Sequence, residues 1–130
     1  FDLIFCPVSV TYIPDVLPVF KESFRVLKNG GKFLFGSVNP LIYLFDNDKY
    51  DKGIFEVSNK LPFNSFDELT NNQIVEFINN REPIEYSHTL EELIEGQTEV
   101  GFTIEDFYED IDQDEICNYT CKYFATKAVK

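Results

Sequence analysis

Phe1-Asp2-Leu3-Ile4-Phe5-Cys6 is the stretch that decides the fold, a short apolar run closed by Pro7. Its length is typical of a buried strand in a parallel sheet. A helix follows, with Asp15 expected as its N-cap. Its apolar side chains share one helical stripe: Val16, Phe20, Phe24 and Leu27. Asn29-Gly30-Gly31 ends the helix, and Lys32–Val38 is the second strand. The order strand, helix, glycine turn and strand predicts a right-handed βαβ unit with parallel strands.

The remainder of the chain has an irregular middle and a regular end. Residues 40–85 are rich in aromatic and amide side chains without a clean period, so we expect an insertion that forms a lid or binding loop. Its aromatic side chains could equally form a satellite core. Within it, the pattern favours a short strand at 53–57 and a helix at 71–80.

The last third again shows regular patterns. The capping box Thr89-Leu90-Glu91-Glu92 begins a helix that ends at Gly101. Strands at 102–108 and 120–129 form a hairpin across an acidic connector, so they run antiparallel. We expect one α/β domain over residues 1–130, with strand-helix-strand at 1–39, the insertion at 40–85, and a helix and terminal β-hairpin at 86–130.

Composition argues against several partners and locations. Eleven Lys and Arg against 23 Asp and Glu give a net charge of −12, which repels nucleic-acid phosphates and anionic membrane surfaces. No apolar run approaches the ~18 residues of a membrane span. Three Cys without a dense framework favour a reducing compartment, and we expect a cytoplasmic protein. Because Met is absent and Phe1 already lies inside an apolar run, we expect a piece of a longer chain.

No metal site is expected. Cys117 and Cys121 have no second pair and no His nearby, which argues against zinc. Asp110-Ile111-Asp112-Gln113-Asp114 imitates the start of a calcium loop, but Glu115 stands where that loop requires Gly. The acidic run is therefore expected to be a solvated hairpin loop.

Three segments carry a resemblance to a known family. They are Phe1–Phe5, then Val10-Thr11-Tyr12-Ile13-Pro14-Asp15, then Phe24-Arg25-Val26-Leu27-Lys28-Asn29-Gly30-Gly31-Lys32-Phe33-Leu34-Phe35. Together they resemble the second half of class I S-adenosylmethionine-dependent methyltransferases, and the tail from Ser87 to Ile104 is similar to that family's last helix and final hairpin. The resemblance implies a partial Rossmann-like methyltransferase sheet. Its strands would correspond to the family's fourth, fifth, seventh and sixth in that spatial order, with the last strand of the chain antiparallel.

The same resemblance implies that the grip on the cofactor is incomplete. The six Gly stand at positions 30, 31, 36, 53, 96 and 101, so the chain has no Gly-x-Gly turn of the kind that lets a backbone approach a nucleotide. S-adenosylmethionine is the implied cofactor of the intact protein, and we expect this chain alone to bind it weakly or not at all. The chain alone is therefore expected to be inactive.

Candidate site residues come from strand ends and from the segment that returns from the insertion. Cys6, Pro7 and Val8 follow the first strand, where ligands bind in open α/β sheets, and by resemblance they would line the cofactor. By resemblance, residues around the acceptor mouth would bind substrate: Tyr12, Asn39, Pro40, Tyr86 and His88. His88 could accept a proton from the acceptor, but no catalytic residue is assigned, because Thr11 and Asn39 stand where many relatives carry a candidate base.

Two functions from different classes remain open. The first is part of a methyltransferase that acts on a small-molecule acceptor. The second is a non-enzymatic interaction or structural module derived from a methyltransferase half. With either function, the strand at 1–6 would present an open apolar edge. We therefore expect the chain to form a homodimer through this strand.

Overall fold

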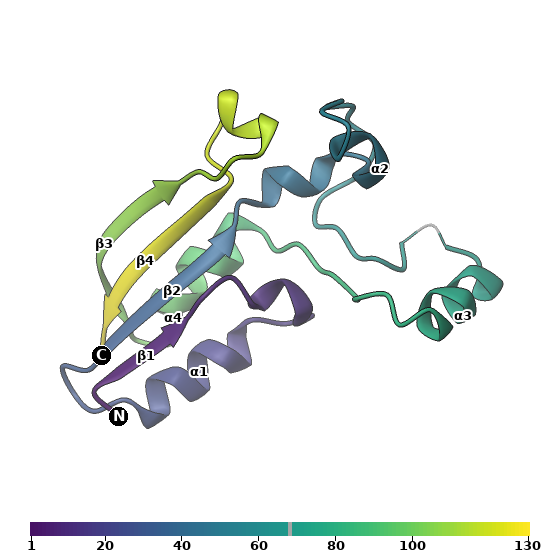
Figure 1. Cartoon of the computed structure of the whole chain (residues 1–130). Helices are drawn as coiled ribbons and strands as arrows, with labels where there is room; N and C mark the ends of the chain where they lie inside the picture. The colour runs from purple at the N-terminus through teal and green to yellow at the C-terminus, as the bar shows by residue number, and fades with distance from the viewer. Residues whose placement is uncertain (68) are drawn as a thin grey trace.

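The computed structural model describes residues 1–67 and 69–130. Helices and strands follow one another from a short N-terminal strand to a long C-terminal one (Figure 1). The strands are β1 (Leu3–Cys6), β2 (Lys32–Val38), β3 (Thr103–Asp110) and β4 (Tyr123–Val129). The α-helices are α1 (Leu17–Val26), α2 (Asn47–Tyr50), α3 (Asn71–Asn79) and α4 (Gly96–Glu99). Short 3₁₀ helices cover Val10–Tyr12, Pro40–Leu44 and Glu115–Asn118, and a π-helical turn at Glu91–Glu95 leads into α4.

The four strands form one mixed sheet in the order β1-β2-β4-β3. β1 pairs with β2 in parallel, with Leu3 opposite Lys32 and Cys6 opposite Phe35. β4 runs antiparallel to both β2 and β3. The predicted fold class, strand order and antiparallel last strand are therefore confirmed.

The connection between the parallel strands also follows the sequence pattern. The expected N-cap Asp15 is wrong by one residue, because the N-cap of α1 is Val16; the Asp15 carboxylate accepts a hydrogen bond from the Leu17 N–H at 3.0 Å just before it. Gly30 has φ +78°, a left-handed backbone that favours glycine and lets the chain turn into β2.

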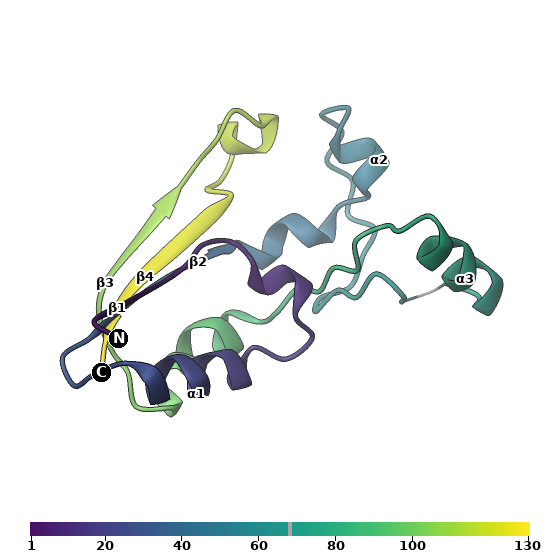
Figure 2. The same cartoon turned by 60° about the horizontal axis from the view of Figure 1, so that its bottom comes forward.

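Both covering helices lie on one face of the sheet. Figure 2 shows α1 and α4 beneath the sheet, with no helix of the described residues on the other face. Alternate residues of β2 and β4 pack toward these helices, and Phe20 of α1 contacts the rings of Phe33 and Phe35 at centroid distances of 6.0 and 5.2 Å. The buried cluster comprises Val10, Val16, Phe20, Leu27, Phe33, Phe35, Leu93, Phe102, Phe124 and Ala128.

The insertion between β2 and the π-helical turn projects away from the sheet and returns to it (Figures 1 and 2). The predicted helix is confirmed as α3, and Thr70 and Gln73 form a capping box at its start. The strand expected at 53–57 is wrong, because only Val57 pairs, in an isolated bridge with Phe45. Phe55 instead packs against the ring of Phe45, so side-chain clustering replaces a β-ladder there.

Candidate functional site

The candidate site lies where the chain leaves the carboxyl ends of the parallel strands β1 and β2. In open α/β sheets such ends form the crevice that takes ligands. Pro7 and Val8 follow β1, and Asn39 and Pro40 follow β2. Tyr86 and His88, on the segment that returns from the insertion, come back to the same place, because the Tyr86 N–H donates to the Thr11 carbonyl at 2.7 Å.

Of the three predicted cofactor residues at the end of β1, Pro7 and Val8 open toward the uncovered face of the sheet, whereas Cys6 packs against the buried cluster. Pro7 and Val8 are exposed and line a groove of about 460 Å³ on that face, together with Phe5, Tyr108 and other strand residues. Cys6 is half-buried, and its Sγ lies 3.6 Å from the Ser9 Oγ. The groove leaves this strand end accessible to a ligand.

The predicted substrate residues divide into two groups. Pro40, Tyr86 and His88 line one small cavity of about 10 Å³, together with Thr11, Ser37, Val38, Tyr43, Ser87 and Leu93. Tyr12 is 55% exposed and lies outside the lining of that cavity. Asn39 acts as a helix cap, since its Oδ1 accepts from the Leu41 N–H at 3.1 Å. The cavity has room for about one water molecule.

His88 is buried inside this wall rather than exposed beside the following helix. It is 6% exposed, and its Nε2 lies 3.1 Å from the Val10 carbonyl oxygen. A carbonyl only accepts, so Nε2 carries the proton in this contact and Nδ1 is the acceptor of the neutral ring. The Thr89–Glu92 capping box, confirmed by contacts of 2.8 and 3.0 Å, fixes the chain immediately after His88.

Tyr43 closes the cavity from the insertion, whose aromatic side chains were expected to form either a lid or a satellite core; its contact with Thr11 was not predicted. Its hydroxyl forms a hydrogen bond with Thr11 Oγ1, and its ring stacks on Phe63 at 5.6 Å. Burial raises the pKa of Tyr43 to about 12, although the bond to Thr11 acts in the opposite direction. Thirty-two residues separate Tyr43 from Thr11, and no local pattern signals such a contact.

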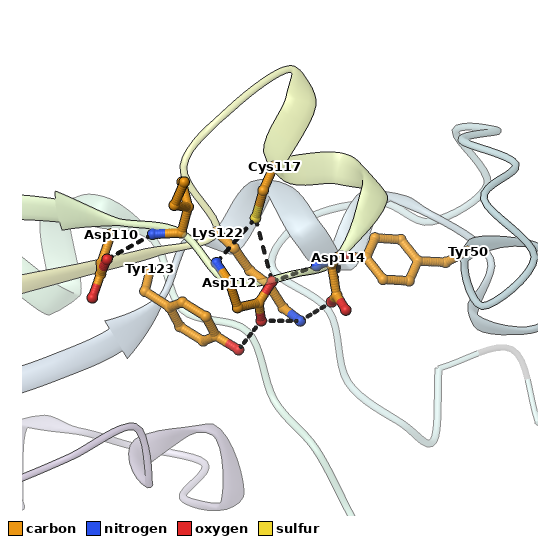
Figure 3. Close-up of polar contacts among 8 residues, drawn as sticks. Tyr50, Asp110, Asp112, Asp114, Cys117, Lys122 and Tyr123 are labelled. Carbon is orange, nitrogen blue, oxygen red and sulfur yellow. Dashed lines mark hydrogen bonds and ion pairs between the residues drawn. The ribbon is translucent and has the colours of Figure 1, made fainter.

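A second polar cluster lies at the β3–β4 loop, beside the insertion (Figure 3). Lys122 binds the carboxylates of Asp112, at 3.1 Å, and Asp114. Burial alone would raise the pKa of Asp112, but hydrogen bonds from the Asp114 backbone, Lys122, Tyr123 and Cys117 outweigh it and hold that pKa well below its usual range. The acidic run is thus not simply a solvated loop, because two of its carboxylates are paired.

Within the described ranges, no group of three or more His, Cys, Asp or Glu side chains is arranged to hold a metal ion. A helix both long enough and apolar enough to cross a bilayer is likewise not found among the described residues.

Comparison with known proteins places this geometry among methyltransferases. A family model described as "Methyltransferase domain" matches residues 1–35. The "Uncharacterized methyltransferase YbaJ" of Bacillus subtilis (strain 168) is 38% identical over 130 residues, which cover all of this chain and 51% of that protein. The chain therefore spans about half the length of this curated relative.

Solved structures agree with the fold. An S-adenosylmethionine-dependent methyltransferase from Mesorhizobium loti superposes with a TM-score of 0.68 at 15% identity, over 100% of this chain and 62% of that one. An S-adenosylmethionine-dependent methyltransferase from Clostridium acetobutylicum gives a TM-score of 0.60 at 17% identity, over 99% of this chain and 58% of that one. Along its entire length the chain is therefore similar in sequence to a methyltransferase, and its fold matches part of the fold of solved S-adenosylmethionine-dependent methyltransferases.

Proposed function

We propose that this chain is the acceptor-side part of a methyltransferase that acts on a small molecule. The observation that carries the proposal is the cavity at the ends of β1 and β2, in which Thr11, Tyr43 and His88 meet. Polar groups converge there on a small space, which would admit the polar group of a small acceptor once the surrounding wall moves. The net charge of −12 opposes a nucleic-acid acceptor. The three free, half-buried cysteines support our expectation of a cytoplasmic enzyme.

The residues around the cavity contribute by positioning the acceptor. S-adenosylmethionine supplies a methyl group that is already activated, so the protein's contribution is to hold the acceptor in line. His88 donates from Nε2 to Val10, which leaves Nδ1 free to accept a proton or a hydrogen bond from the acceptor. Tyr86 and Tyr43 form the wall that orients it.

We also propose that the chain alone does not hold the cofactor. Cys6, Pro7 and Val8 offer a strand end, of which only Pro7 and Val8 line the groove, and none of the six glycines forms a Gly-x-Gly turn. Titration calorimetry of the chain with S-adenosylmethionine is expected to give no saturable binding at micromolar concentrations. A micromolar dissociation constant would contradict this proposal.

A chimera tests the methyltransferase role itself. Fusing this chain to a glycine-rich N-terminal half from a class I methyltransferase is expected to restore micromolar cofactor binding. Release of S-adenosylhomocysteine is then measured against a panel of small amines, alcohols and thiols. His88→Ala is expected to lower turnover while leaving cofactor affinity unchanged, and Lys32→Ala, at an exposed position in β2, is the control. Unchanged turnover in His88→Ala would exclude a role for that residue.

The exposed strand β1 favours one alternative, a non-enzymatic interaction module. Leu3 and Phe5 are both exposed, and the backbone of an edge strand offers unpaired groups to a partner. Under this alternative the chimera would fail to bind cofactor although it folds, and the chain would still associate through β1.

A further inference from the structure

The β3–β4 loop at 111–122 packs against residues 39–59, which follow β2 and form the first part of the insertion, although the two segments are far apart in the sequence (Figures 1 and 3). We propose that Lys122 is a positioning residue for the acceptor cavity: it fixes the loop at 111–122, this loop supports the insertion, and the insertion holds Tyr43 against Thr11. This inference deepens the proposed function and rests on it for its meaning, but the contacts that carry it can be tested without methyl transfer.

Lys122 is the centre of the loop. Its side chain is only 17% exposed and lies between Asp112 and Asp114. The Asp112 carboxylate also accepts from the Tyr123 hydroxyl at 2.9 Å and from the Asp114 N–H at 2.9 Å. Figure 3 shows these groups converging from both sides of the loop. Without the lysine, two neighbouring carboxylates would lose the cation between them and repel each other.

The loop contacts the insertion at several points. The Tyr50 hydroxyl donates to Asp114 Oδ2 at 3.4 Å, so one carboxylate serves both Lys122 and the insertion. The ring of Phe55 meets that of Tyr119 edge-on at 5.8 Å.

Backbone contacts strengthen this docking. The Asn39 N–H donates to the Lys122 carbonyl at 2.8 Å. The Glu115 carboxylate fills the space where a side chain on Gly53 would stand, and Gly53 has φ +72°, so glycine is needed there for both space and backbone conformation. The loop therefore touches the insertion near its start and in its middle.

The insertion transmits this support to the cavity. Phe45 is buried and contacts the rings of Tyr50 and Phe55 at 6.2 and 5.6 Å. The Asn59 amide ties the neighbouring backbone together, since its Nδ2 donates to the carbonyls of Tyr43 at 3.1 Å and Phe45 at 3.0 Å. Tyr43 is thus fixed by an aromatic cluster that rests on the charged loop.

Another lysine of β4 provides a matched control. Lys127 also forms an ion pair, with Glu105 at 2.9 Å, but its partner lies on β3 and both side chains are well exposed. A general effect of removing one lysine from β4 would appear in both variants, whereas an effect on the cavity wall should appear only for Lys122.

The experiment is hydrogen exchange with mass spectrometry on the 130-residue chain, in the wild type and in Lys122→Met, Lys122→Arg and Lys127→Met. We expect exchange within residues 41–59 to rise about tenfold in Lys122→Met, to stay near wild type in Lys122→Arg, and to be unchanged in Lys127→Met. Acetylation of Tyr43 by N-acetylimidazole, located by mass spectrometry, should rise in Lys122→Met alone.

Unchanged exchange at 41–59 in a folded Lys122→Met would overturn the inference, as would an equal rise across β1 and β2. If Lys122→Met does not fold, Tyr50→Phe removes only the hydroxyl that contacts Asp114, and the same local rise is required of it. Because neither readout needs cofactor or acceptor, a failure here is distinguishable from a failure of the methyltransferase proposal, which the chimera tests.

Discussion

Removal of the Tyr43 hydroxyl should change how stability responds to alkaline pH. Tyr43→Phe deletes a buried hydroxyl bonded to Thr11, which costs about 1 kcal/mol near pH 9. The pKa of Tyr43 is raised to about 12 in the folded chain, whereas an unfolded tyrosine titrates near 10. The neutral form is therefore favoured by folding, and its contribution is complete below about pH 10 and is lost as the pH rises toward 12.

The magnitude follows from these two pKa values. Between pH 9 and 11.5, proton linkage lowers the free energy of unfolding of the wild type by roughly 2 kcal/mol through Tyr43. Solvent screening of this half-buried side chain reduces the loss to roughly 1 kcal/mol. By pH 11.5 the wild type and Tyr43→Phe should therefore have about the same free energy of unfolding. Urea unfolding followed by circular dichroism at several pH values measures the two free energies. Tyr12→Phe is the control, because Tyr12 is exposed and should behave as wild type throughout. A gap between wild type and Tyr43→Phe that stays constant from pH 9 to 11.5 would refute the reasoning.

Two further predictions concern the core and the edge of the sheet. Thr126→Val removes the hydroxyl that donates to Gln97 Oε1 at 2.8 Å inside the core. Because the fully buried amide oxygen is left without this donor, the free energy of unfolding should fall by about 1–3 kcal/mol in urea unfolding. Adding Gln97→Met to Thr126→Val should recover part of that free energy, and no recovery would contradict the pairing. At high concentration, light scattering should show that the wild-type chain self-associates through β1. Phe5→Glu, which changes a side chain that is 69% exposed, should convert the oligomer to a monomer. A wild type that stays monomeric would exclude this interface.

The sequence predicted the sheet and α1 because their determinants are local. The apolar run before Pro7 and the stripe from Val16 to Leu27 each occur within a few residues, and Asn29-Gly30-Gly31 terminates the helix by its backbone preferences. These local patterns determine both elements and the buried face of α1, whereas the buried strand expected from the apolar run is wrong for β1, whose Leu3 and Phe5 are exposed because it lies at the edge of the sheet. The family resemblance then supplied the strand order.

The site was predicted less completely, because its contacts join distant residues. Of the residues expected to bind substrate, Pro40, Tyr86 and His88 line one cavity, and Tyr12 lies outside its lining. The substrate and cofactor roles of all these residues stay predictions. Tyr43 sits in a segment with no clean period, so nothing local indicates which way it faces.

The charged loop shows the same limit. Lys122 is one cation at the end of an acidic run, and composition alone indicates solvated carboxylates there. Its pairing with Asp112 and Asp114 depends on how the chain returns into β4, which is a tertiary property.

The two ends of the long insertion converge at the cavity, where Pro40 and Tyr86 line the same space. A segment that leaves and rejoins the sheet at one place can be shortened, lengthened or exchanged without altering strand register, since loop closure depends only weakly on length. Under the proposed function, a change in this segment would alter acceptor preference while leaving the pairing of the strands beneath it intact.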